Sequence, residues 1–157
     1  MPVSVQTADF DAGKEIAALY ADAQDVGAVA SFVGVVRQSS TSPQPSPARE
    51  EGASSLNLEH YPGMTEAALA AIVTEANARW HLHKVRVIHR VGNLQIGEQI
   101  VFVGVAAAHR GEAFTACEFI MDYLKTQAPF WKKEETAAGG RWVDARDADD
   151  AAAARWS

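Results

Sequence analysis

The chain has 157 residues, 48% of them hydrophobic and 22% charged, which is the balance of an ordinary globular domain. It has no run of about 18 apolar residues that would span a membrane. A formal net charge of -6 argues against a general nucleic-acid binder, and a single cysteine excludes an internal disulfide framework. We expect one domain over residues 1–157. The N-terminus lacks the pattern of a secretory signal, so we expect a cytoplasmic location.

The first third of the chain predicts a helix, a buried strand and a loop. Residues 12–21 carry apolar side chains at helical spacing behind the capping residue Asp11. Residues 27–36 (GAVASFVGVV) are almost continuously apolar, which is typical of a buried strand. Residues 38–55 are rich in serine and proline and contain no large apolar side chain, so we expect a mobile, insertion-like loop. The alternative for this stretch is a recognition segment.

From residue 56 onward, hydrophobic periodicity and turn residues predict the remaining elements. In order, they are a strand, a helix, a strand, a turn, a strand and a helix, at residues 56–61, 65–80, 84–91, 92–97, 99–107 and 111–127. The polar tail offers Trp142 and Val143 as a last strand. This order indicates an α+β fold with a mixed or antiparallel sheet and helices packed on it.

Two basic stretches are candidate anion-binding groups. His109 and Arg110 lie between a predicted strand and a helix, where free backbone N–H groups and a guanidinium suit a phosphate. The alternative is a solvated pair on a connection. Lys132 and Lys133 follow the helix-stopping residues 128–131 (APFW), whose aromatic pair is expected to anchor this loop to the core. Arg37 ends a buried strand, a common place for a functional side chain.

Lys125 has a more specific position. It follows Phe114 by eleven residues, about three helical turns, and so projects within about 20° of it. It therefore lies at the edge of the apolar face formed by Phe114, Cys117, Met121 and Leu124. A lysine at such an edge either extends to solvent or occupies a pocket, where its amine would serve as a base or nucleophile.

Other catalytic classes find little support. Cys117 falls on the apolar helix face, so we interpret it as a small core residue. His60, His81, His83 and His89 do not form a metal-ligand spacing, and we predict no metal site. The chain has no GxxxxGK[ST], GxGxxG or GxSxG motif, which disfavours an ATP-dependent ligase, a dehydrogenase and a hydrolase. If the cationic candidates converge, their pocket suits a small anion such as a phosphate ester.

The chain resembles the large-subunit family of molybdopterin synthase. Eight motifs in order carry this resemblance: FVGVVR (32–37), LEHYPGM (58–64), HRVG (89–92), VFVGV (101–105), AHR (108–110), FIMDYLK (119–125), APFWK (128–132) and RWV (141–143). Their combination is specific, whereas each motif alone is weak. The segment 38–55 looks longer than the family's usual loop.

The resemblance implies an α/β hammerhead-type fold and a sulfurtransferase of molybdenum cofactor biosynthesis. It implies a central homodimer with a small sulfur-carrier subunit at each end, making a heterotetramer. The carrier's C-terminal Gly-Gly thiocarboxylate would deliver sulfur to cyclic pyranopterin monophosphate and form the molybdopterin dithiolene, without metal or other cofactor. The competing hypothesis is a non-enzymatic module that binds a phosphate ligand or the carrier.

By matching position, the resemblance also implies roles for individual residues. Lys125 and Lys132 would be catalytic. The implied substrate-binding residues are Arg37, His109 and Arg110, with Arg146 contributed by the dimer mate, and Val35, Val36, Lys133 and Glu134 in matching stretches.

Overall fold

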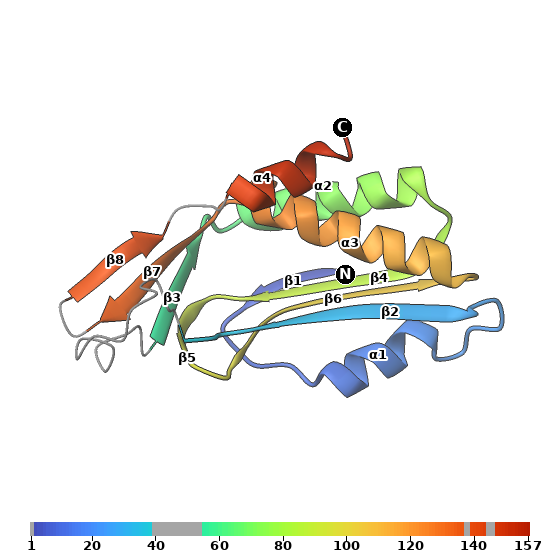
Figure 1. The fold of residues 1–157 in the computed structure, drawn as a ribbon. Helices are drawn as coiled ribbons and strands as arrows, with labels where there is room; N and C mark the ends of the chain where they lie inside the picture. Colours follow the sequence, from blue (N-terminus) through green and yellow to red (C-terminus); the bar gives the residue numbers. More distant parts are fainter. Residues whose placement is uncertain (1, 39–54, 137–138, 144–146) are drawn as a thin grey trace.

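A computed structural model of the chain describes residues 2–38, 55–136, 139–143 and 147–157, with only the backbone described between 132 and 148 (Figure 1). Its elements are β1 (Val3–Gln6), α1 (Ala12–Tyr20), β2 (Ala28–Val35), β3 (Ser55–His60), α2 (Met64–Arg79), β4 (Leu82–Arg90), β5 (Gly92–Gln95), β6 (Gln99–Ala107), α3 (Arg110–Gln127), β7 (Phe130–Thr136), β8 (Gly139–Val143) and α4 (Asp147–Ala154). Among the described residues, no helix is long and apolar enough to cross a membrane.

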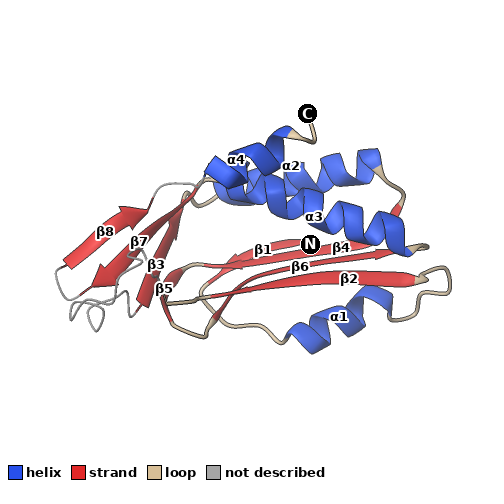
Figure 2. Cartoon of the chain, viewed as in Figure 1, coloured by secondary structure: helices blue, strands red, loops and turns tan. Residues whose placement is uncertain are grey.

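The larger sheet has the strand order β1-β4-β6-β2 and forms the middle layer of the molecule. Strand β1 runs parallel to β4, whereas β6 pairs antiparallel with both β4 and β2. Helices α2 and α3 cover one face of this sheet and α1 covers the other (Figure 2). This arrangement explains why β6 is apolar along its length, since a strand covered on both faces has no side open to water.

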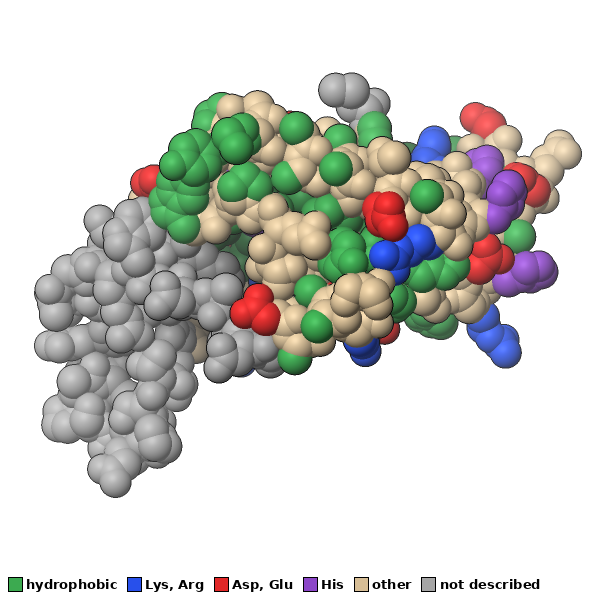
Figure 3. All heavy atoms as spheres, turned by 90° about the horizontal axis from the view of Figure 1, so that it is seen from above, with side chains coloured by type: hydrophobic (Ala, Val, Ile, Leu, Met, Phe, Trp, Pro, Cys, Tyr) green, Lys and Arg blue, Asp and Glu red, His purple; other side chains and the backbone are tan. Residues whose placement is uncertain are grey.

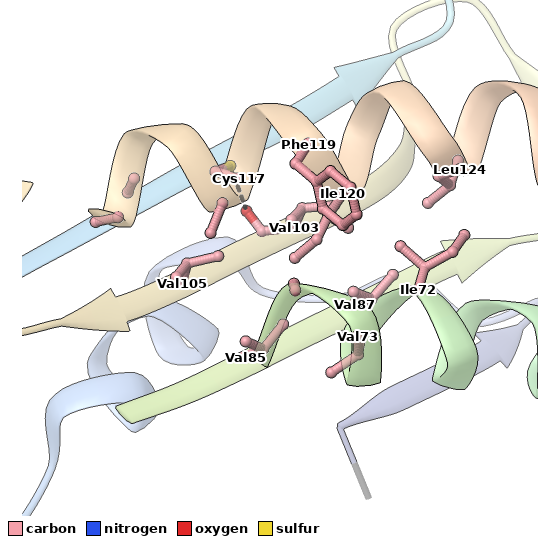
Figure 4. Packing of buried hydrophobic residues seen from close by; sticks show 14 of the residues in the cluster. Ile72, Val73, Val85, Val87, Val103, Val105, Cys117, Phe119, Ile120 and Leu124 are labelled. Carbon is pink, nitrogen blue, oxygen red and sulfur yellow. Dashed lines mark hydrogen bonds between the residues drawn. The ribbon is translucent and has the colours of Figure 1, made fainter. Parts of the chain in front are cut away.

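The main core lies between the larger sheet and helices α2 and α3. Figure 4 shows side chains of α3 pointing at β6 and β4, with Ile120 above Val103 and Val87. On the opposite face, Leu19 of α1 packs with Phe102. Alternate residues of β6 therefore supply the two cores, as the period of two in a strand requires.

The smaller sheet has the strand order β5-β3-β7-β8 and is antiparallel throughout. It lies at the end of the molecule where β2 finishes and β6 begins (Figure 1). A small apolar cluster of Val36, Leu58 and Leu94 joins it to the larger sheet. Ile100 packs against both this cluster and the main core, so the two sheets share one continuous apolar interior.

The structure confirms the predicted α+β class and the predicted helices α1, α2 and α3. It also confirms the strands expected near residues 27–36, 56–61, 84–91 and 99–107, and a last strand that contains Trp142 and Val143. Part of the predicted turn at 92–97 is instead strand β5, which pairs with β3. The expected loop 38–55 lies outside the described residues at 39–54, and its last residue, Ser55, begins β3.

Candidate active site

The site residues predicted from sequence divide between two ends of the larger sheet. In the antiparallel pairing of β2 with β6, Val35 lies opposite Gln99, and Ala28 lies opposite Ala107. Arg37 therefore lies beside the start of β6, where the smaller sheet begins. His109 and Arg110 follow the other end of β6, about nine residues and roughly 30 Å away along the strand.

Helix α3 spans the distance between these two ends. Arg110 begins the helix and Lys125 is in its last turn, so their backbones are separated by about 22 Å along the axis. Both side chains are exposed in the single chain. Within a single chain, Lys125 therefore lies at the same end of the larger sheet as Arg37 and the smaller sheet. His109 and Arg110 of that chain lie at the opposite end.

The start of α3 is a candidate position for an anion. His109 occupies the N-cap position in an extended backbone conformation, and its side chain makes no capping hydrogen bond. The first-turn N–H groups consequently retain capacity for an external acceptor, at the positive end of an 18-residue helix. The exposed side chains of His109 and Arg110 flank this position.

Lys132 is placed by strand pairing. It lies opposite Leu58 of β3, and Leu58 is buried against Val36, the residue before Arg37. The backbone positions of Arg37 and Lys132 thus flank one apolar cluster. Lys133 and Glu134 lie opposite Asn57 and Leu56, further along β7. The side chains of Lys132, Lys133 and Glu134 lie outside the described part of the structure, as does the whole of Arg146.

Val35 and Val36 differ from each other in environment. Val35 lies at an irregularity in the pairing of β2 with β6 and is 48% exposed. Val36 is buried, its N–H donates to the carbonyl of Glu98 at 2.9 Å, and its carbonyl accepts from the N–H of Gly97 at 2.8 Å. Val35 is therefore available to a ligand, whereas Val36 fixes the position from which Arg37 extends.

The aromatic pair between the two lysines is anchored, but as part of a strand rather than a loop. The ring of Phe130 stacks on His89, with centroids 3.7 Å apart and planes at 17°. The indole N–H of Trp131 donates to the carboxylate of Glu59 at 3.1 Å. The sequence motif containing His89 therefore supports the segment before Lys132, a role that its residue types alone did not indicate.

The apolar face predicted for α3 needs one correction. Cys117 and Leu124 are buried as expected, but Phe114 is 67% exposed. The buried face instead includes Ala113, Ala116 and Ile120, because α3 rests on β6 and β2 while α2 lies at its side. Phe114 consequently lies on an open flank of the helix together with Lys125.

Cys117 is unsuited to act as a nucleophile. Its thiol is buried against the sheet and lies 3.8 Å from the carbonyl oxygen of Val103, to which it donates (Figure 4). Burial raises the pKa of this thiol to about 11, and the neighbouring carboxylate of Glu118 acts in the same direction. A thiolate is therefore scarce near neutral pH, and the prediction that Cys117 is a core residue is confirmed.

A groove of about 590 Å³ lies elsewhere on the molecule. It is lined by β4 between His83 and Arg86 together with residues of α1 and α2, and none of the predicted site residues lines it. Within the described ranges, no three His, Cys, Asp or Glu side chains gather in a manner that could hold a metal ion. In the space-filling view of Figure 3, the His side chains on the described surface that faces the viewer lie at the end of the molecule away from the grey atoms, and the Lys and Arg side chains form no single patch.

Together, these features define an α+β protein with cationic residues at both ends of one helix and a buried cysteine. Comparison with known families is consistent with this class. The family described as MoaE protein matches residues 5–127, more than half of the chain, and the chain belongs to this family.

Individual relatives agree over nearly the full length. The chain is 60% identical to the molybdopterin synthase catalytic subunit of Ralstonia nicotianae over 154 residues, which cover 98% of this chain and 83% of that protein. The solved MoaE protein of Burkholderia ambifaria is 52% identical with a TM-score of 0.79, covering 100% and 99% of the two chains. The solved molybdopterin synthase of Staphylococcus aureus is 28% identical with a TM-score of 0.80, covering 92% and 98%.

Proposed function

We propose that Lys125, Lys132 and Arg37 form the reaction centre of this chain, which acts as the catalytic subunit of a molybdopterin synthase. The reaction transfers sulfur from the C-terminal thiocarboxylate of a small carrier subunit to cyclic pyranopterin monophosphate and forms the molybdopterin dithiolene. One observation carries the proposal: the backbones of these three cationic residues gather at one end of the fold, beside the smaller sheet. They supply positive charge for an anionic substrate and for an anionic sulfur donor.

The sulfur source is a separate protein. The chain contains one cysteine, and burial keeps its thiol protonated near neutral pH. A carrier with a C-terminal Gly-Gly thiocarboxylate supplies the sulfur in a form that is already anionic. Two transfers are needed for the dithiolene, and in each a bond forms between a thiocarboxylate sulfur and a pterin side-chain carbon while a carbon–oxygen bond at that carbon breaks. One of these oxygens stays on the phosphate, whose ring opens, and the other leaves as water. In each transfer the bond between the sulfur and the carrier's carbonyl carbon also breaks. The acyl group then passes to water, directly or after brief attachment to a lysine amine.

The lysines have different tasks in this scheme. Lys125 is exposed at the end of α3, so an incoming carrier tail or substrate can reach and cover it without disturbing the core. We assign it the proton transfer at the reacting carbon, or the transient acyl attachment. Lys132 and Arg37 bind the phosphate, with Val35, Lys133 and Glu134 as neighbouring contacts and Val36 as support.

A second copy of the chain completes the site. The flank of α3 opposite α2 carries Arg110, Phe114, Met121 and Lys125 within about 60° of one another, with a cation at each end and apolar residues between. A two-fold axis through the middle of this flank brings Arg110 of one copy toward Lys125 of the other. His109 and Arg110 thereby reach a substrate that they cannot reach within their own chain.

The neighbouring strand has a matching arrangement. Strand β2 is an edge of the larger sheet among the described strands, and it exposes Phe32 and Val35. Antiparallel apposition of two β2 edges would place the Ala28 end of one copy beside the Val35 end of the other. This arrangement again brings His109 and Arg110 of one copy close to Arg37 of the other copy. We propose that Arg146 also acts across this interface.

The assembly is then a homodimer with one carrier at each end, a heterotetramer. We propose that residues 1–157 act as one domain, supported by the packing of Ile100 on both apolar clusters, and that the enzyme works in the cytoplasm. The exposed Phe114 on α3 and the exposed Phe32 and Val35 on β2 support an interface, because several large apolar side chains exposed on neighbouring elements are typical of an interaction surface.

Reconstitution tests the function directly. Purified chain, thiocarboxylated carrier and cyclic pyranopterin monophosphate are mixed, and dithiolene product is measured. Product should form only when all three are present, and carrier with an ordinary carboxylate should be inactive. A chain that binds both the carrier and the substrate without making product would instead support the alternative of a non-enzymatic binding module.

A further inference from the structure

The turn between β3 and α2 holds the segment that connects the two lysines. In the pairing of β3 with β7, Glu59 lies opposite Trp131 and His60 lies opposite Phe130. This turn belongs to the motif LEHYPGM, which the proposed chemistry leaves without a task. Its contacts with residues 128–131 are more specific than strand pairing alone requires.

Thr65 makes the central contact. Its side chain is fully buried, with 0% exposure, in the first turn of α2. The hydroxyl accepts a hydrogen bond from the N–H of Tyr61 at 3.1 Å and donates one to the carbonyl of Pro129 at 3.0 Å. One side-chain oxygen therefore ties the turn and the start of α2 to the segment that leaves α3.

Aromatic and polar contacts fasten the next residues of the same segment. Trp131 donates to Glu59, and its ring meets that of Tyr61 edge-on at a centroid distance of 4.9 Å. Phe130 stacks on the buried His89. Three successive residues, Pro129 to Trp131, are thus each held by a different group immediately before Lys132.

These contacts act on the spacing between the lysines. Lys125 is fixed by α3, whereas Lys132 follows after the helix has ended at Gln127 and the chain has turned into β7. Nothing within α3 itself determines where β7 begins. The carbonyl of Pro129 is the first point after the helix at which a buried side chain from another element holds the backbone.

We propose that Thr65 is a positioning residue that sets Lys132 relative to Lys125 through its hydrogen bond to Pro129. This inference rests on the proposed function, because it assumes that both lysines act on one substrate. Displacement of a reacting group by about 1 Å can cost on the order of 100-fold in rate. The carrier's affinity is expected to change far less, because it sums contacts over a whole interface rather than depending on the position of one side chain. Thr65 therefore governs the rate of transfer and leaves carrier binding unchanged.

The test compares Thr65→Val with Thr65→Ser in the full chain with carrier. Valine keeps the branched shape and removes both hydrogen bonds, whereas serine keeps the hydroxyl. Thr74→Val, at an exposed position on the same helix, is the matched control. Single-turnover dithiolene formation at saturating carrier and substrate should fall by about 10- to 100-fold in Thr65→Val, with the carrier Kd unchanged. Thr65→Ser and Thr74→Val should remain close to the unmodified chain.

Each outcome has a distinct meaning. A folded Thr65→Val chain with an unmodified single-turnover rate overturns the inference, and so does a loss that Thr65→Ser does not restore. If Thr65→Val does not fold, Thr65→Ala removes the same hydroxyl without placing a methyl group against the polar atoms of Tyr61 and Pro129, and it should lower the rate in the same way; an unchanged rate there also overturns the inference. Absence of turnover in the unmodified chain would refute the proposed function itself.

Discussion

The two sheets of this molecule are stabilised in different ways. The larger sheet is covered by helices on both faces, and its strand β6 carries an almost continuous run of buried apolar side chains. The smaller sheet contains β7, whose sequence FWKKEET is mostly polar and which is held by pairing with β3 and β8. The larger sheet therefore provides the scaffold, and the smaller sheet holds one of the proposed catalytic lysines.

Because of this difference, we expect substitutions in the larger sheet to affect mainly folding stability and substitutions near the smaller sheet to affect mainly the reaction. A residue in the larger core affects folding because its removal leaves a cavity between the sheet and the helices. We expect removal of the exposed Lys125 at the end of α3 to affect the reaction and to leave folding unchanged, because no buried group depends on this side chain. Thr65, Phe130 and His89 lie where the two regions meet, and there a single change can affect both properties.

The largest effect on activity is expected from Lys125→Ala. Loss of a positioned proton-transfer group commonly lowers the rate by about 10²–10⁴-fold. Thermal unfolding and carrier binding should change little, since the side chain is exposed. Lys125→Arg should not restore the rate, because guanidinium stays protonated and is bulkier. Lys14→Ala, at an exposed position of α1, is the control. A single-turnover rate equal to that of the unmodified chain would remove Lys125 from the mechanism.

Phe102→Ala in the larger sheet is expected to lower stability and to leave the reaction rate of folded chains unchanged. Phe102 is fully buried between β6 and α1, and its truncation should lower the free energy of unfolding by about 3–5 kcal/mol. Chemical denaturation measures this loss. The folded fraction should keep its single-turnover rate, so a strong loss of rate in fully folded chains would show that the scaffold and the chemistry are not separate.

Lys132→Ala is expected to have a smaller effect than Lys125→Ala, and to change substrate affinity more than the maximal rate. If Lys132 mainly binds the phosphate, its loss should weaken substrate binding more than it slows transfer at saturation. Titration of substrate in single-turnover experiments separates these two effects. A slower maximal rate with unchanged substrate affinity would instead assign Lys132 to the chemical step.

The smallest effect on turnover is expected from Cys117→Ser. The thiol is buried and its pKa is raised to about 11, so it is protonated in the folded chain throughout the neutral range. Between the unfolded thiol's pKa near 9.0 and this value, the unfolded state ionises first, so the thiol's contribution to stability is lost as pH rises. Alkylation of Cys117 at pH 8 should accordingly be much slower in folded than in unfolded chain. Abolished turnover in folded Cys117→Ser would restore a cysteine mechanism.

The sequence predicted the scaffold better than the site for a physical reason. Apolar periodicity is local, and it identified α2, α3 and β6. The strands β5 and β7 lack that signal, because β5 has four residues and β7 is polar, and both depend on pairing with β3, which is distant in sequence from β7. Motif resemblance supplied the lysines, and the predicted helix 111–127 already placed His109 and Arg110 at the end opposite Lys125. Only the strand pairing placed Arg37 and Lys132 at the same end of the fold as Lys125.

Contacts between motifs that are distant in sequence could not be predicted from local patterns either. The hydroxyl of Thr65 and the carbonyl of Pro129 are 64 positions apart, so no local pattern could connect them. Phe114 was predicted on the buried face by helical spacing, yet α3 is covered from the other side and leaves it exposed. Periodicity identifies a helix and its apolar residues, whereas the direction of burial depends on which elements pack beside it.

The claim that Lys125 of one copy and Arg110 of the other act in one site is tested most directly by mixing two impaired variants. Lys125→Ala and Arg110→Ala chains are each expected to be impaired, the first in its own site and the second in the partner's site. Unfolded together and refolded, half of the dimers should be mixed, and each mixed dimer contains one site with both groups intact. The mixture should recover roughly a quarter of the unmodified single-turnover activity. Activity no higher than the average of the two separate variants would show that Lys125 and Arg110 do not act together across a dimer.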